Sequence, residues 1–285
     1  MRKAANAVAG CPATKANTAD FREEYTMKFY EFGNRSGKTI MCLPGNFMTH
    51  RQFSKIVPLL ENEYHIITVS FDGYDETGET TYTTGKEQAE KLASYIRERL
   101  NRKMDLVYAE SLGSIPAAFL TRYDDIEIGG IILSGAEYMN YGIFNAPAIG
   151  LFAPMTYKLM TKIIRTKEVK FPKFLQIKMG ITNDTFRPML EQACQNLTLE
   201  TTKATFREAV KMYPEYMSKW EPNPDIRLAC WYGEKEMNMK KAIKHLKRAF
   251  PNLEVRPFEG LGHGEIMVHE DLLMKELINF MERKA

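Results

Sequence analysis

The sequence predicts an α/β fold in which a doubly wound, mostly parallel sheet carries helices on both faces and a helical insertion interrupts the order. Three observations predict it. Apolar strand-like runs alternate with segments of helical periodicity along most of the 285 residues. Several runs are apolar at every position, as strands buried on both faces are. Between residues 139 and 224 the alternation stops and helical fragments replace it.

The first elements follow from local patterns. Residues 25–32 alternate in polarity and predict a strand, a Gly-Asn-Arg-Ser-Gly turn follows, and residues 38–43 predict the next strand. Residues 51–60 predict a helix that Pro58 breaks near its end. Residues 65–71 form an apolar strand that Asp72-Gly73 ends. Apolar positions at helical spacing predict a helix over residues 86–100.

The second half repeats the alternation. An apolar run from Leu106 leads to Ser111, and a helix is expected from there to about Tyr123. Further strands are expected at residues 129–135, 227–232 and 253–258, and helices at residues 235–250 and 265–283. Ligands of such sheets bind beyond the carboxyl ends of the strands.

We therefore expect a flexible N-terminal lead over residues 1–20 and a core domain built from residues 21–138 and 225–285. Residues 139–224 form the expected cap, or lid, because they are rich in Met, aromatic residues and Pro. Most apolar cap residues are expected to pack onto the body. Phe144, Phe152 and Met155 are candidates to face the cleft beneath, which would suit a partly apolar substrate.

Composition excludes several classes of protein. The net charge of +3, from 39 basic and 36 acidic residues, is too balanced to indicate a nucleic-acid partner. No run approaches the roughly 20 apolar residues of a membrane span. The four cysteines form no C-x-x-C pair, so neither a disulfide framework nor a zinc site is expected. Val8 to Cys11 imitates a lipoprotein cleavage site, but the apolar stretch before it is too short for a signal peptide. We expect a cytoplasmic protein.

The stretch from Leu106 to Ser114 carries the chemistry. It reads Leu-Val-Tyr-Ala-Glu-Ser-Leu-Gly-Ser, an apolar run that breaks into small-x-Ser-x-Gly before a helix. A strand, a tight turn and a helix would hold the Ser111 hydroxyl at the rim of the sheet. The turn leaves no room for large side chains two residues either side of the serine. Ser111 is the candidate nucleophile.

A serine nucleophile needs a base, and the base needs an acid to orient it. Among five histidines, His263 lies in a Gly-Leu-Gly-His-Gly loop between the last strand and the last helix, where a mobile imidazole suits a general base. A histidine that only caps that helix is the alternative. Glu236, after the preceding strand, is the preferred acid, with Glu234 and Glu137 as alternatives.

Two backbone N–H groups are needed to stabilise an oxyanion. Leu112 follows the nucleophile and supplies one. The turn Pro44-Gly45-Asn46-Phe47 follows the second strand and supplies the other, from Asn46 or, as second choice, Phe47, which could also contact substrate. An ordinary strand-ending turn would fit these four residues equally well, so the argument rests on the order of the whole set.

With the oxyanion turn, serine, acid and histidine in this order, the chain resembles the α/β-hydrolase superfamily from about Tyr25 to its C-terminus. The resemblance implies about eight strands, a nucleophile elbow at Ser111 and a cap after the strand that ends at Ser134. Ala109 stands where the family usually has Gly, and Pro44-Gly45 where many members have His-Gly. Glutamate is a minority choice of acid in the family.

The sequence thus predicts a serine hydrolase that cleaves a small-molecule carboxylic ester or thioester through an acyl-enzyme, without metal or cofactor. Acyl transfer, amide cleavage and C–C bond hydrolysis on the same triad are the enzymatic alternatives. A ligand-binding homologue that has kept the fold without catalysis is the remaining one.

Overall fold

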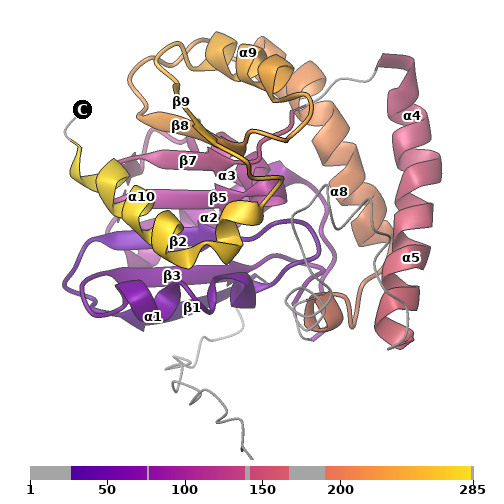
Figure 1. The fold of residues 1–285 in the computed structure, drawn as a ribbon, viewed down its shortest axis with the longest axis horizontal. Coiled ribbons are helices and arrows are strands. Elements are labelled where there is room, and N and C mark those ends of the chain that lie inside the picture. Colours follow the sequence, from indigo (N-terminus) through magenta and orange to yellow (C-terminus); the bar gives the residue numbers. More distant parts are fainter. Residues whose placement is uncertain (1–26, 76, 139–141, 167–189, 284–285) are drawn as a thin grey trace, which may run out of the picture.

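The computed structural model describes residues 27–75, 77–138, 142–166 and 190–283. Its central feature is a seven-stranded sheet with the order β1-β3-β2-β5-β7-β8-β9 (Figure 1). The edge strand β1 pairs antiparallel with β3, and every other pair in this sheet is parallel. The strands are β1 (Lys28–Gly33), β2 (Thr39–Leu43), β3 (His65–Ser70), β5 (Leu106–Glu110), β7 (Ile131–Ser134), β8 (Leu228–Gly233) and β9 (Glu254–Phe258).

The resemblance implied about eight strands, and the described residues place seven in this sheet. A separate parallel pair joins β4 (Lys103–Met104) to β6 (Glu127–Ile128). Each predicted strand is present to within a few residues, so the expected fold class is confirmed. The expected flexible lead over residues 1–20, including Cys11, lies outside the described residues.

Helices cover both faces of the sheet, as a doubly wound fold requires. On one face lie α2 (Gly85–Arg99), α3 (Ser114–Leu120) and α9 (Met239–Ala249), and on the other α1 (Val57–Leu60) and α10 (Glu270–Glu282). Each face of the sheet has its own hydrophobic core, and alternate residues of a strand contribute to opposite cores. In β7, Ile131 and Leu133 pack in the core beneath α2, α3 and α9, whereas Ile132 packs in the core beneath α1 and α10. The fully apolar strand pattern therefore reflects burial on both faces.

Three predicted helices differ from the observed ones. The helix expected over residues 51–60 is instead a 3₁₀ turn, η1 (His50–Phe53), followed by the short α1, because Pro58 fits only the first turn of a helix. The last helix is divided into η7 (Glu265–Val268) and α10. The helix expected from residue 235 begins at Met239, since Asn238 is left-handed with φ +70°.

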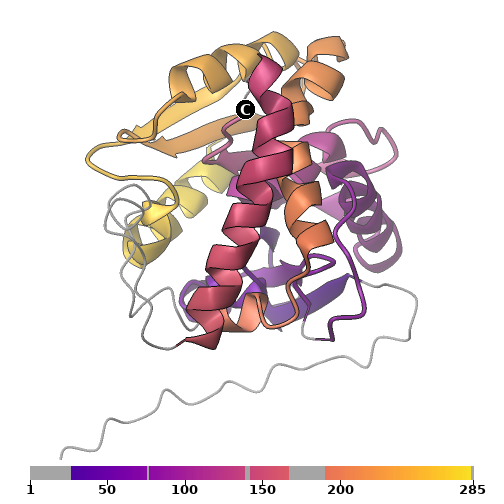
Figure 2. The same ribbon diagram turned by 90° about the vertical axis from the view of Figure 1, so that its right-hand side faces the viewer.

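The insertion between β7 and β8 is helical, as expected. Its first part is one continuous run of η3 (Gly142–Phe144), α4 (Asn145–Pro147), the π-helical η4 (Ala148–Phe152) and α5 (Ala153–Arg165). Its second part is α8 (Leu199–Lys211), η5 (Met212–Tyr216) and η6 (Met217–Lys219). The first run is the outermost layer, and α8 lies between it and the sheet (Figures 1 and 2).

Helix α8 is fastened to the core by polar contacts at its inner face. Glu208 is buried and accepts a hydrogen bond of 2.7 Å from the backbone N–H of Gly85, the first residue of α2. One turn earlier, Thr205 accepts a hydrogen bond of 3.4 Å from the side-chain amide of Asn46. These contacts set one face of α8 above the carboxyl ends of the strands, where the site described below is found.

Two further findings concern the described residues. Cys42, Cys194 and Cys230 are buried and carry no disulfide. In the described ranges, no helix combines the length and the apolar character needed to cross a bilayer.

Candidate active site

Ser111 sits on a sharp turn between β5 and α3. Its φ of +48° is left-handed, a region that non-glycine residues enter only at a cost in energy. A one-turn 3₁₀ helix, η2 (Ser111–Gly113), leads directly into α3. Gly113 has no room for a side chain, because an added Cβ would lie 2.7 Å from the carbonyl oxygen of Leu43. The small-x-Ser-x-Gly pattern therefore reflects close packing of this turn against the end of β2.

The two segments expected to supply oxyanion donors lie side by side. β2 pairs with β5 in parallel, with Leu43 opposite Ala109, so the turn after β2 and the turn after β5 leave the same edge of the sheet. This is also the point where the strand order reverses, the usual ligand position in such sheets. Leu112 and Asn46 line a common pocket with Ser111. Within the described chain, the backbone N–H of neither residue has a protein acceptor.

The structure ties the side chain of Asn46 to its surroundings. Its amide oxygen accepts a hydrogen bond from the Tyr74 hydroxyl, and its amide nitrogen donates to Thr205. The side-chain oxygen and nitrogen of Asn46 therefore both have partners, and its backbone N–H is the group that remains to donate to a ligand in the pocket. Phe47, the second choice, is left-handed with φ +62°, is 8% exposed and is not among the residues that line this pocket.

His263 joins the serine to a carboxylate. Its Nε2 lies 3.0 Å from the Ser111 hydroxyl, and its Nδ1 lies 2.8 Å from Glu236 Oε2. Glu236 is itself fixed, since its other oxygen accepts a hydrogen bond of 2.7 Å from the N–H of Gly233. The side chain of Glu236 is only 1% exposed. Three residues that are 125 and 27 positions apart in the chain thus form one continuous hydrogen-bonded series.

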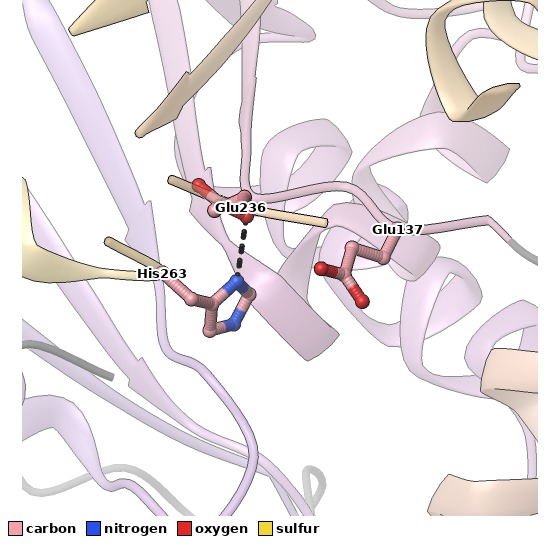
Figure 3. Close-up of side chains that lie close together, drawn as sticks. All are labelled: Glu137, Glu236 and His263. Carbon is pink, nitrogen blue, oxygen red and sulfur yellow. Dashed lines mark hydrogen bonds and ion pairs between the residues drawn. The ribbon is translucent and has the colours of Figure 1, made fainter. Parts of the chain in front are cut away.

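The alternative acids take other positions. Glu234 is exposed and accepts a hydrogen bond of 3.1 Å from the N–H of Gly260. Glu137 follows β7, and its carboxylate points toward the His263 ring (Figure 3). Ligand atoms of Glu137, Glu236 and His263 all lie within 4.8 Å of one another. Such a group has the ligand types of a metal site, but both ring nitrogens of His263 already have protein partners, Glu236 at Nδ1 and Ser111 at Nε2.

Electrostatics favour a proton on His263. Burial lowers the pKa of this imidazole, but the hydrogen bond and charge of Glu236, with the charges of Glu110 and Glu137, outweigh burial and raise the pKa to about 9. A strong negative field around the imidazole is what stabilises an imidazolium formed during catalysis. An imidazolium cannot accept a proton, so any role of His263 as a base would require that it first lose this one.

Glu110 belongs to the candidate site by position, although it was not singled out from the sequence. It is 2% exposed, and its Oε1 atom is buried without a hydrogen-bond partner in the described part of the chain. An added Cβ on Gly135 would meet both the His263 ring, at 2.8 Å, and Glu110 Oε1, at 3.4 Å. Burial raises the pKa of Glu110 to about 7, against the attraction of His263. The feature of the sequence that could have identified Glu110 is its position directly before Ser111, at the end of a buried strand.

The pocket at Ser111 has a volume of about 210 Å³. Its lining comes from the core and from α8 of the cap, and it mixes hydroxyl, apolar and carboxylate side chains. It comprises Asn46, Ser111, Leu112, Ser114, Ile115, Gly135, Glu137, Tyr138, Thr205, Phe206, Ala209 and His263. The α8 residues were not expected, although their spacing places them on one helix face.

The cap residues proposed for substrate contact lie elsewhere in the structure. Phe144, Phe152 and Met155 are 64%, 52% and 56% exposed, and none of them lines this pocket. They belong to the outermost helical run, whereas α8 stands between that run and the sheet. The sequence pattern of an insertion does not tell which of its helices faces the site.

Comparison with known proteins defines the fold. No model of a known family matches the sequence, and no curated protein matches it. Solved structures do match. An α/β-hydrolase family protein from Desulfitobacterium hafniense is 18% identical, with a TM-score of 0.73 over 90% of this chain and all of that one. An esterase from a marine microorganism is 15% identical, with a TM-score of 0.67 over 89% of this chain and 98% of that one.

A third neighbour carries a different activity in its name. An epoxide hydrolase from Solanum tuberosum is 14% identical, with a TM-score of 0.62 over 90% of this chain and 95% of that one. The chain therefore has the α/β-hydrolase fold with a helical insertion, and its structural neighbours are α/β hydrolases. At these identities the similarity establishes the fold, and the reaction has to be argued from the site.

Proposed function

We propose that this protein is a serine hydrolase that cleaves a small-molecule carboxylic ester or thioester. Ser111 is the nucleophile, His263 the general base and then general acid, and Glu236 the acid that orients His263. The observation that carries the proposal is the series of hydrogen bonds from Glu236 through His263 to Ser111, at 2.8 and 3.0 Å. These are the separations at which proton transfer between such groups is efficient.

In the proposed reaction, Ser111 Oγ attacks the acyl carbonyl carbon while its proton passes to His263 Nε2. The backbone N–H groups of Leu112 and Asn46 donate to the resulting oxyanion, and Glu236 stabilises the imidazolium. The bond to the alcohol or thiol breaks, and that group leaves with the proton from His263. Water then attacks the acyl-enzyme, gives its proton to His263 and releases the acid, after which Ser111 regains its proton.

The pocket supports a compact acyl group. Its volume of about 210 Å³ falls below the roughly 300–1,000 Å³ of pockets that hold drug-sized ligands. Ile115, Phe206 and Ala209 give it an apolar side, in keeping with a partly apolar substrate. The same acyl-enzyme would serve acyl transfer if an alcohol or amine replaced water. A ligand-binding homologue, amide cleavage and C–C hydrolysis remain the competing functions that experiment has to exclude.

A fluorophosphonate probe tests the nucleophile. We expect the wild type to be labelled and Ser111→Ala to be unlabelled, with Ser54→Ala, an exposed serine on the same domain, labelled as the wild type is. His263→Ala should suppress labelling as well, since Ser111 loses its base. A folded wild type that resists the probe would favour the ligand-binding alternative.

Hydrolysis of p-nitrophenyl esters then tests the reaction. We expect acetate and butyrate esters to be cleaved with higher kcat/KM than decanoate esters, and Ser111→Ala to lose at least about a thousandfold. A set of three Glu→Gln variants identifies the acid. Glu236→Gln should lower kcat by roughly a thousandfold or more, whereas Glu234→Gln should leave it within a few-fold of wild type. The largest loss at position 137 would assign the role to that carboxylate instead.

A further inference from the structure

The outermost helical run of the cap exposes an unusual amount of apolar surface. Of the eight large hydrophobic side chains that are exposed in the described ranges, five lie within residues 143–155. They are Ile143 at 86%, Phe144 at 64%, Leu151 at 56%, Phe152 at 52% and Met155 at 56%. The other three are scattered over the core domain, at residues 59, 237 and 272. Concentrated exposure of this kind marks an interaction surface, unlike isolated exposed residues.

The same run continues into a cationic segment. Lys158, Lys162 and Arg165 are exposed, and they follow Met155 at spacings of three and four residues, which places these four residues on one side of α5. Leu151 lies four residues before Met155, in the preceding η4. Residues 142–166 contain these three cations and no Asp or Glu. The run therefore presents an apolar stripe at one end and, at the other, a positive stripe with no acidic residue of its own. We call residues 143–165 the cap face.

We propose that the cap face binds the surface of an anionic phospholipid bilayer. An amphipathic helix lies in such a surface when it offers exposed Phe and Leu side chains together with Lys and Arg. Each Lys or Arg near an anionic leaflet adds to the attraction, and the apolar side chains enter the boundary between headgroups and acyl chains. Among the described elements the cap face is the outer layer, with α8 behind it (Figure 2), and its five large apolar side chains are exposed.

The dimensions of the face argue against a second copy of the chain as its partner. The apolar stretch of 13 residues is about 20 Å long and about 10 Å wide, or roughly 200 Å². Stable protein interfaces bury about 800 Å² on each partner. Insertion into a bilayer needs only a few side chains and an opposite surface charge, and the cap face supplies both. This proposal stands apart from the proposed hydrolase function and does not require it.

Vesicle co-sedimentation of the full-length protein tests the proposal. We expect binding to vesicles of phosphatidylcholine mixed with phosphatidylserine, weaker binding to phosphatidylcholine alone, and loss of binding as salt is raised. Lys158→Gln combined with Lys162→Gln should weaken binding about fivefold for each charge removed. Ile143→Ser combined with Leu151→Ser should weaken it by about tenfold or more.

Helix α9 offers a matched control, because it carries exposed lysines without a neighbouring apolar stripe. Lys240→Gln combined with Lys244→Gln removes the same charge and should bind vesicles as the wild type does. Unfolding midpoints of all variants are compared to confirm that each is folded, as expected for substitutions of exposed side chains. The proposal is overturned if the wild type ignores phosphatidylserine, or if the α9 pair weakens binding as much as the α5 pair. It is also overturned if the protein is a dimer in light scattering that the Ile143 and Leu151 substitutions convert to a monomer.

Discussion

The hydroxyl of Tyr108 donates a hydrogen bond of 3.0 Å to Oε2 of Glu110, while the other oxygen of Glu110 has no partner in the described part of the chain. Both residues belong to β5 and are buried. A buried carboxyl group with a hydrogen bond to only one of its two oxygens is costly to ionise, and burial accordingly raises the pKa of Glu110 to about 7. When it does ionise, its charge holds a proton on His263.

Glu110→Gln is therefore expected to shift the pH dependence of ester hydrolysis. Activity requires neutral His263, whose pKa of about 9 places the rising limb of kcat/KM in the alkaline range. Removing the charge of Glu110 makes the imidazolium less stable, so the pKa of His263 falls and the limb moves to lower pH by roughly one unit. The measurement is kcat/KM at pH values from about 6 to about 10, in steps of about one pH unit.

Glu234→Gln removes the same charge at an exposed position and serves as the control. A purely structural role for Glu110 would lower kcat equally at every pH and leave the limb where it is, which would contradict the prediction. Stability gives a second readout. Because the pKa of Glu110 is raised from 4.5 to about 7 on folding, the wild type should lose more stability than the Gln variant as pH rises through that window.

The backbone of Ser111 supports a prediction about stability. Its φ of +48° costs a residue with a Cβ roughly 1 kcal/mol, a cost that glycine escapes. Ser111→Gly should thus be more stable than Ser111→Ala by about 1 kcal/mol, although both lose the hydroxyl and the activity. Urea unfolding of the two variants side by side decides it. Equal stabilities would mean that the turn is not strained.

Much of the architecture was predictable because apolar runs report burial directly. The run from His65 to Ser70 is buried at all six positions, and the predicted strand matches it. The order of Ser111, Glu236 and His263 suggested residues that the structure then places in hydrogen-bonding contact. Their catalytic roles stay predictions until they are tested.

What the sequence did not reveal depends on tertiary packing. The helical pattern over residues 51–60 is interrupted by Pro58, which fits only the first turn of a helix. The residues before it form a 3₁₀ turn instead, and hydrophobic periodicity does not distinguish such a turn from an α-helix. In the cap, both α5 and α8 have amphipathic patterns, and only their packing decides that Thr205 and Phe206 reach the pocket while Met155 faces outward. Glu110 escaped notice because a charged residue in a strand end ordinarily faces solvent.

Gly113 should resist any side chain. An added Cβ would lie 2.7 Å from the carbonyl oxygen of Leu43 and 2.8 Å from that of Pro44, so the turn after β5 and the turn after β2 would have to separate. Gly113→Ala is expected to cost about 1–3 kcal/mol of stability. It should lower kcat more than it raises KM, since it displaces the proposed nucleophile and the proposed oxyanion donors together.

Gly150→Ala is the control for this substitution, because a Cβ there would point into open space, with no atom beyond its own helix backbone and chain neighbours within 4 Å. In that exposed helical position alanine should be neutral or slightly stabilising. Thermal unfolding and steady-state kinetics of the pair are compared. Wild-type kinetics in a stable Gly113→Ala protein would show that the close approach to β2 is not needed.

Glu208 tests how far the cap helix α8 depends on the core. It is buried and accepts the hydrogen bond from the N–H of Gly85 at the start of α2, where helix N–H groups lack partners within the helix. Glu208→Ala leaves this donor unpaired and should cost about 1–3 kcal/mol, whereas Glu208→Gln keeps an acceptor oxygen and should cost less. Burial raises the pKa of Glu208, which means that its charge is disfavoured in the folded protein. Removing that charge in either variant therefore offsets part of the stability lost with the hydrogen bond.

The kinetic consequence follows from the position of Glu208 on α8, one turn beyond the pocket residue Thr205. If the bond to Gly85 sets the height of α8 above the pocket, Glu208→Ala should raise KM for short esters by several-fold while Ser111 still reacts with a fluorophosphonate at saturating probe. Glu215→Ala, an exposed acid on the same part of the cap, should change stability by less than about 0.5 kcal/mol and leave KM unaltered. An unchanged KM in a destabilised Glu208→Ala protein would show that α8 is held in place by its apolar contacts, and that Glu208 contributes to folding without shaping the pocket.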